Sequence, residues 1–163
     1  MKSPAYLEKI QTLPEVLRRI GDWRAFGESI VFTNGCFDIL HPGHADYLSK
    51  AATLGDRLVI GLNSDASVSS LKGDNRPIQS EYARASILAA LSFTDLIVVF
   101  DAPTPIKLIT ALMPDILVKG GDYLPENIVG YDVVTQSGGK VMTVDFLPGY
   151  STSAIEEKIR RQG

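Results

Sequence analysis

The 163-residue sequence has little cysteine and no long apolar run. Its one cysteine, Cys36, excludes an intrachain disulfide and fits a reducing, cytoplasmic compartment. No apolar stretch approaches the roughly 20 residues of a membrane span. Residues 1–9 also lack the apolar core of a signal peptide. We therefore expect a cytoplasmic protein that has no membrane partner.

An excess of basic charge is also missing. The chain has 16 Lys and Arg against 19 Asp and Glu, which gives a formal net charge of −3. Nucleic acid is therefore not expected as a partner, because its phosphates need a basic surface. The hydrophobic share of 45% and charged share of 21% are those of a folded globular chain of about one domain.

Apolar runs and helical patterns alternate along residues 29–163, which we assign to one domain. This alternation indicates βαβ units and a parallel sheet. In such sheets, ligands bind beyond the carboxyl ends of the strands, where the strand order reverses. The expected strands are 30–33, 57–62, 96–100, 116–118 and 141–144, and the expected helices are 43–54, 64–71, 81–91, 105–112 and 153–160.

Residues 1–28 are predicted to be a helical extension. Thr12 and Glu15 have the spacing of a helix capping box, and Pro14 suits the first turn. The apolar residues that follow recur at helical spacing. We expect this helix to pack on the main body or on another subunit.

Both histidines of the chain lie just after the first expected strand. His41 and His44 are three residues apart and share one face of a helical turn, with Gly43 between them. A helix start with exposed N–H groups suits an anion, and Gly35 and Gly43 let a phosphate approach the backbone. Phosphate chemistry is favoured over a structural turn and over a metal pair, because zinc usually has further His or Cys ligands.

Hydroxyls and cations recur at other expected loops. Ser151, Thr152 and Ser153 precede the last helix, where they either cap it or bind an anion. Lys72 and Arg76 lie on a glycine-containing loop and either close over phosphates or are simply solvated.

Four further features each have more than one interpretation. The stretch from Lys119 to Asp122 follows a strand and could form a base or ribose pocket, or only a turn. Asp38 could orient a histidine, meet the substrate phosphate or cap the turn. Arg84 follows Glu81 by three residues on an expected helix, and it could form a surface ion pair or belong to the site. Cys36 is favoured as a small buried residue over a nucleophile.

The segment Gly35–His44 resembles the H-x-G-H signature of the cytidylyltransferase-like nucleotidyltransferase superfamily. Further matches cover about residues 29–160. The Lys119–Tyr123 stretch in particular is similar to the adenylyltransferase domains of bacterial ADP-heptose synthesis, which many bacteria fuse behind a sugar kinase. Residues 1–28 are too short for that kinase, so we expect the stand-alone form. The resemblance implies a Rossmann-like, doubly wound, parallel five-stranded sheet flanked by helices.

The implied reaction joins ATP and D-glycero-β-D-manno-heptose 1-phosphate to give ADP-heptose and pyrophosphate, in the synthesis of lipopolysaccharide inner-core precursors. Mg²⁺ is expected to accompany ATP, with no resident metal, and a dimer or larger homo-oligomer is expected. The alternative is a cytidylyltransferase of a polyol phosphate such as glycerol 3-phosphate. The implied site comprises catalytic His41, His44 and Lys72; nucleotide-binding Asn34, Gly35, Cys36, Phe37, His41, Gly43, His44, Lys119, Gly120, Asp122, Tyr150, Ser151, Thr152 and Ser153; and substrate-binding Asp38, Lys72 and Arg76.

Overall fold

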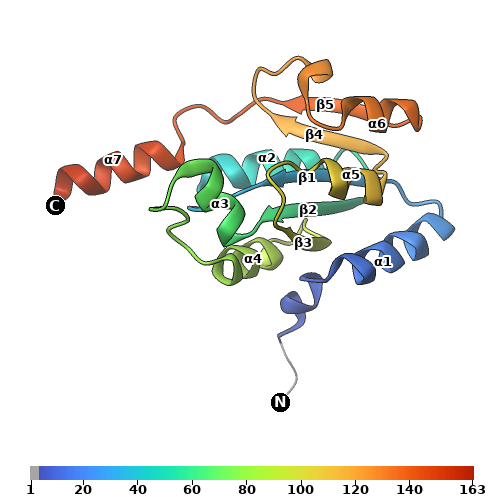
Figure 1. The fold of residues 1–163 in the computed structure, drawn as a ribbon, viewed down its shortest axis with the longest axis horizontal. Coiled ribbons are helices and arrows are strands. Elements are labelled where there is room, and N and C mark those ends of the chain that lie inside the picture. The colour runs from blue at the N-terminus through green and yellow to red at the C-terminus, as the bar shows by residue number, and fades with distance from the viewer. Residues whose placement is uncertain (1–3) are drawn as a thin grey trace.

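A computed structural model describes residues 4–163 and shows a five-stranded, all-parallel sheet with helices on both faces (Figure 1). The strand order is β3-β2-β1-β4-β5. This confirms the expected fold class. The strands are β1 (Ile30–Gly35), β2 (Arg57–Asn63), β3 (Leu96–Phe100), β4 (Ile116–Gly120) and β5 (Lys140–Val144).

The helices that were expected from the sequence are all present, with ends that coincide or shift by at most two residues. Two elements between β4 and β5 were not expected, namely a short 3₁₀ turn and α6. Neither carries a capping side chain, which is the signal that would have indicated them. The elements are η1 (Ala5–Lys9), α1 (Leu13–Ala25), α2 (Pro42–Ala52), α3 (Asp65–Lys72), α4 (Glu81–Ala90), α5 (Ile106–Leu112), η2 (Pro125–Asn127), α6 (Tyr131–Gln136) and α7 (Thr152–Gln162).

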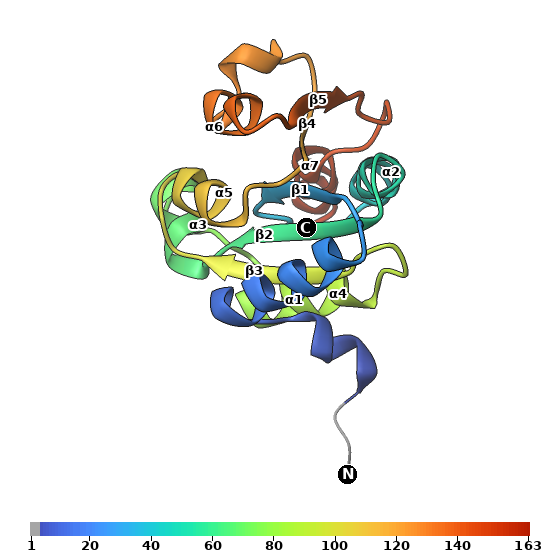
Figure 2. The same ribbon diagram turned by 90° about the vertical axis from the view of Figure 1, so that its right-hand side faces the viewer.

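The sheet buries both of its faces. Along β1, Ile30 and Phe32 pack into one core with α1, α5 and α6, whereas Val31 packs into the other core with α2 and α4 (Figure 2). Successive side chains of a strand point to opposite faces of the sheet. Because both faces are buried, each successive residue at the start of β1 has to be apolar. The apolar run at the start of β1 therefore corresponds to a strand that is covered on both faces.

The N-terminal helix packs on the main body, one of the two expected alternatives. Val16 and Ile20 of α1 are fully buried in the same core as β1 and α5. Ile10 forms a parallel bridge with Ile97 of the edge strand β3. The backbone N–H of Thr12 donates to Glu15 Oε2 at 2.8 Å, as the capping pattern predicts. The boundary between residues 28 and 29 stays a prediction.

Arg84 of α4 is neither a surface ion pair nor a cavity residue. Its guanidinium is 1% exposed and donates to the carbonyls of Cys36 and Asn63 at 2.7 and 2.8 Å. It also pairs with Asp65 and not with Glu81. Arg84 thus ties together the ends of β1 and β2.

We predict that α1 belongs to the cooperative folding unit. Ile20→Ala should lower the free energy of unfolding by about 2–5 kcal/mol, because it leaves a cavity in a closed core. Leu17→Ala, on the same helix but 37% exposed, should cost much less. Urea unfolding monitored by circular dichroism measures both. Equal, small losses would show that the extension is not part of the main core.

Candidate active site

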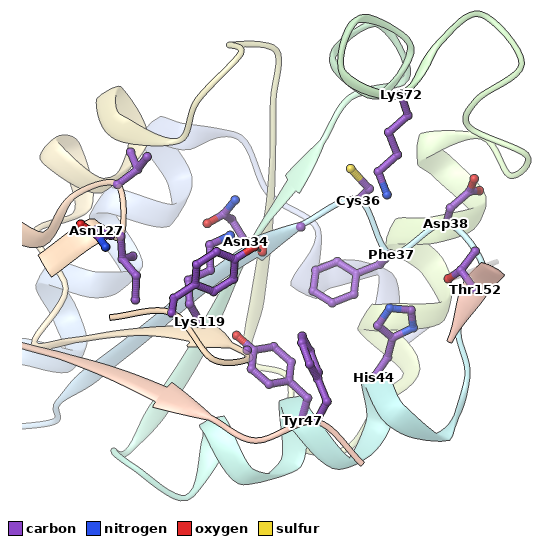
Figure 3. Close-up of a pocket in the computed structure, with 16 residues that line it drawn as sticks. Asn34, Cys36, Phe37, Asp38, His44, Tyr47, Lys72, Lys119, Asn127 and Thr152 are labelled. Atoms are coloured by element: carbon purple, nitrogen blue, oxygen red, sulfur yellow. Dashed lines mark hydrogen bonds between the residues drawn. The ribbon is translucent and has the colours of Figure 1, made fainter. Parts of the chain in front are cut away.

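A cavity of about 430 Å³ opens at the carboxyl ends of β1 and β4 (Figure 3). These two strands are neighbours in the sheet. On one side of β1 lie β2 and β3, and on the other side lie β4 and β5, so the direction in which strands are added reverses between β1 and β4. The cavity is therefore at the reversal of strand order, as expected. Of the predicted site residues it is lined by Asn34, Gly35, Cys36, Phe37, Asp38, His44, Lys72, Lys119, Gly120 and Thr152.

The turn after β1 is built around Phe37. This residue has a left-handed φ of 48°, which is uncommon for a residue with a side chain. Its ring lies so close to Gly35 that a Cβ there would be 2.9 Å from it. The ring also meets His44 edge-on, with 5.4 Å between centroids. Phe37 thus sets the position of His44.

The two histidines stack on each other, with ring centroids 3.8 Å apart. His41 is the N-cap of α2, and its Nδ1 accepts the Gly43 backbone N–H at 3.1 Å. A Cβ on Gly43 would lie 2.9 Å from that Nδ1, so the glycine is needed for the histidine as well as for any ligand. His41 is not itself part of the cavity wall, and its contact with the wall is the stacking of its ring on His44.

Burial keeps both imidazoles neutral. Desolvation lowers the pKa of His44 to about 4, with smaller contributions from His41 and the Lys72 ammonium. Burial also lowers the pKa of His41. Near pH 7 each ring therefore carries one N–H donor and no charge. Such rings can donate a hydrogen bond to a phosphate oxygen.

Two lysines bring positive charge to opposite ends of the cavity (Figure 3). Lys72 ends α3 and extends toward the His44 side. Lys119 leaves β4 toward Asn34, with its Nζ 3.5 Å from the Asn34 carbonyl oxygen, and burial lowers its pKa. At the Lys119 end an anionic ligand would gain a partly desolvated cation, and at the other end it would meet the exposed ammonium of Lys72.

The charges of Asp38 and Arg76 are used within the protein. The Asp38 carboxylate accepts the backbone N–H groups of Ile78 and Gln79 at 2.9 Å and pairs with Arg76 at 2.8 Å. These bonds hold the pKa of Asp38 below its ordinary value in spite of its burial. Arg76 also pairs with Glu156 of α7 at 3.0 Å. Among the described residues the carboxylate forms no hydrogen bond with a histidine, and the substrate-binding roles of Asp38 and Arg76 stay predictions.

The start of α7 brings hydroxyls to the same side. Ser151 caps the helix by accepting the Ala154 N–H at 3.1 Å, and Thr152 lines the cavity. Tyr150 and Ser153 are exposed. Six predicted nucleotide-binding residues are thus outside the cavity wall, and their roles stay predictions: His41, Gly43, Asp122, Tyr150, Ser151 and Ser153.

Part of the cavity wall was missed by sequence reasoning. Tyr47 lies on α2, and its hydroxyl bonds to Thr33 and to the Val118 carbonyl, while burial raises its pKa to about 12. Phe146 follows β5, and a Cβ on Gly120 would overlap its ring. Only Tyr123 stood within a recognisable motif, the glycine-containing stretch after β4. The complete set of missed wall residues is Tyr47, Tyr123, Asn127, Ile128, Val129 and Phe146.

Across residues 4–163, no three His, Cys, Asp or Glu side chains converge as a metal site. None of the helices described is long and apolar enough to cross a membrane.

Comparison with known proteins places the chain in a family. The profile of the cytidylyltransferase-like family matches residues 32–158, a span that contains the whole cavity wall. The chain belongs to the cytidylyltransferase-like family. Its membership fits a cavity whose wall includes His44, Lys72 and the Thr152 hydroxyl at the start of α7.

The chain is similar to two curated proteins that are each called bifunctional protein HldE. It is 54% identical over 142 residues to the one from Rhodopseudomonas palustris strain HaA2, which is 87% of this chain and 29% of that protein. It is 52% identical over 159 residues to the one from Nitrobacter hamburgensis, which is 95% of this chain and 32% of that protein. The chain thus spans about a third of the length of these relatives.

Two solved structures share the fold. A lipopolysaccharide core biosynthesis protein from Thermoplasma volcanium superposes with a TM-score of 0.58 at 27% identity, over 74% of this chain and 98% of that one. Pantoate-beta-alanine ligase from Francisella tularensis gives a TM-score of 0.60 at 14% identity, over 93% and 76%. At that identity the ligase supports the fold alone.

We predict that the neutral histidines make the fold sensitive to mild acid. The pKa of His44 is lower in the folded chain than the ordinary value of 6.5, so below pH 6.5 the unfolded chain binds a proton that the folded chain does not. The free energy of unfolding should therefore fall by about 2 kcal/mol between pH 7 and pH 5. The lowered pKa of Asp38 acts only at more acidic pH.

Urea unfolding at pH 5, 6 and 7 tests this, with His44→Gln as the comparison. The variant should lose most of the slope because glutamine does not titrate. Parallel pH profiles for the two proteins would assign the acid sensitivity to other groups.

Proposed function

We propose that this chain is an adenylyltransferase that joins ATP and D-glycero-β-D-manno-heptose 1-phosphate, giving ADP-heptose and pyrophosphate for lipopolysaccharide inner-core synthesis. The observation that carries the proposal is the convergence of His44, Lys72 and Thr152 at one end of a cavity whose other end holds Lys119. The HldE relatives are named bifunctional, and this chain matches about a third of their length. One of two activities is therefore expected of it.

The reaction needs alignment more than acid–base chemistry. An oxygen of the sugar phosphate attacks the α-phosphorus of ATP. A new P–O bond forms as the bond to the bridging α–β oxygen breaks, and pyrophosphate leaves with that electron pair. The attacking phosphate is already an anion, so no base has to remove a proton. Catalysis then comes from positioning and from stabilising the charge that develops.

The residues at the His44 end are suited to the triphosphate. The neutral imidazoles of His41 and His44 are N–H donors, Lys72 supplies a charge, and Ser151 and Thr152 supply hydroxyls at a helix start. The Lys119 end is assigned to the nucleoside, with Gly120 and Asp122 close to it in sequence. The Oδ1 of Asn34 is buried there with no partner among the described residues, and a ligand donor would satisfy it.

Mg²⁺ is assigned to the substrate, as MgATP. The carboxylate on the described cavity wall is that of Asp38, and it already accepts hydrogen bonds from Arg76 and from two backbone N–H groups. The chain's own residues therefore fit a metal that is held by phosphate oxygens and water. When bound, the ion neutralises charge on the phosphates as they separate. A cytoplasmic location and a homo-oligomeric state are part of the proposal.

A second candidate is a cytidylyltransferase that acts on a polyol phosphate such as glycerol 3-phosphate, because the matching family is described by that chemistry. Pyrophosphate release with ATP or CTP, each combined with heptose 1-phosphate or glycerol 3-phosphate, separates the two candidates. We predict turnover with ATP and heptose 1-phosphate and little with CTP. Faster turnover with CTP and glycerol 3-phosphate would move the assignment to the second candidate.

We predict that Lys72 acts mainly in the transition state. Lys72→Ala should lower kcat by about a hundredfold, the scale seen when a preorganised donor is removed, with a smaller change in ATP affinity. Lys72→Arg should restore activity only in part, because the guanidinium keeps the charge but not the compact ammonium. Steady-state rates and ATP titration measure both effects. Lys107→Ala, on the exposed side of α5, is the matched control, and a Lys72→Ala rate equal to that control would refute the role.

A further inference from the structure

Helix α7 is attached to the rest of the protein by few contacts. None of its residues is buried, and it extends away from the sheet (Figure 1). In the part of the chain that the structure describes, its one hydrogen bond to a residue beyond the helix and its own N-cap is the pair between Glu156 Oε2 and Arg76 Nη2 of the loop after α3, at 3.0 Å. Both side chains are about one-fifth exposed. This ion pair is therefore well placed to set the position of the helix.

The ion pair lies on the face of α7 that meets the cavity. Thr152 and Glu156 are four residues apart, so they lie on the same face of the helix. Thr152 lines the cavity, and Glu156 contacts Arg76 one turn further on. A rotation of α7 that turned Thr152 away would break the bond to Arg76.

Arg76 is itself held firmly. Its Nη1 donates to Asp38 at 2.8 Å, and the Asp38 side chain is 2% exposed. Asp38 also fixes the backbone of Ile78 and Gln79 on the loop that begins after Lys72. One guanidinium thus links the turn after β1, the loop after α3 and the helix that carries Thr152.

We propose that Arg76 is a positioning residue that docks α7 through Glu156 and so holds Thr152 against the bound triphosphate. The inference rests on the proposed function for the identity of the ligand, and it gives Arg76 an indirect role through α7 and the loop. Its two terminal nitrogens are both occupied by carboxylates. Because Glu156 is the residue of α7 that Arg76 binds, nucleotide affinity should depend on Glu156, although Glu156 lies outside the cavity wall.

Glu156→Gln is the informative substitution, and Glu157→Gln is its matched control. The neighbouring Glu157 pairs with Arg161 of its own helix and is exposed. Charge-assisted hydrogen bonds are about twice as strong as neutral ones. We expect Glu156→Gln to weaken triphosphate binding by about tenfold and to leave the KM of the sugar phosphate within about twofold. Glu157→Gln should match the wild type in both.

The measurements are the dissociation constant of the triphosphate without acceptor, the two KM values, and hydrogen exchange of residues 152–162. Bound nucleotide should slow exchange in α7 of the wild type and of Glu157→Gln, and slow it less in Glu156→Gln. The triphosphate affinity of Arg76→Lys should lie between that of Arg76→Gln and that of the wild type, because one ammonium cannot bridge Asp38 and Glu156 as the guanidinium does.

The binding experiment uses whichever of ATP and CTP the wild type binds. Binding of CTP alone would overturn the proposed function and leave the docking role testable with CTP. Equal nucleotide affinity and equal α7 exchange in Glu156→Gln and Glu157→Gln would overturn the docking role. A Glu156→Gln variant that loses affinity for both substrates equally would show a general structural defect and would also overturn it.

Discussion

The position of β1 between β2 and β4 is the constraint on which the site depends. Because the chain builds β1 to β3 in one direction and then returns to add β4 and β5, the loops after β1 and β4 diverge over neighbouring strand ends. That divergence makes the cavity. It also brings Phe37 and His44 opposite Lys119, although 75 or more residues separate them in the sequence. Arg84 stabilises this arrangement by donating hydrogen bonds to the carbonyls of Cys36 and Asn63, which lie at the ends of β1 and β2.

Burial changes the chemistry of the groups that face the cavity. The stacked histidines lose their charge because desolvation lowers the pKa of each ring. Lys119 is affected in the same direction. An anion that enters this cavity would stabilise the ammonium groups and strengthen the hydrogen bond that the His44 imidazole can donate.

Several charged residues near the cavity serve the architecture. Asp38 and Arg76 resemble ligand-binding groups by sequence position, yet each is engaged by the protein, and Arg84 is fully buried. The polar groups around the cavity thus divide into those that face a ligand and those that hold the loops. The ion pair between Arg76 and Glu156 connects these two sets, because it joins a loop anchor to a helix that carries a cavity hydroxyl.

The sequence by itself determined the sheet, the H-x-G-H turn and the place of the cavity, since apolar periodicity, capping residues and glycine spacing are local signals that the chain carries into any environment. The sequence did not predict η2 and α6 between β4 and β5, because neither has a capping side chain. Only the tertiary structure decided that Tyr47 and Phe146 complete the wall, that Asp38 binds Arg76, and that the histidines are neutral. These outcomes depend on which segments pack against each other and on how much water is excluded, and neither is encoded within a short stretch of sequence.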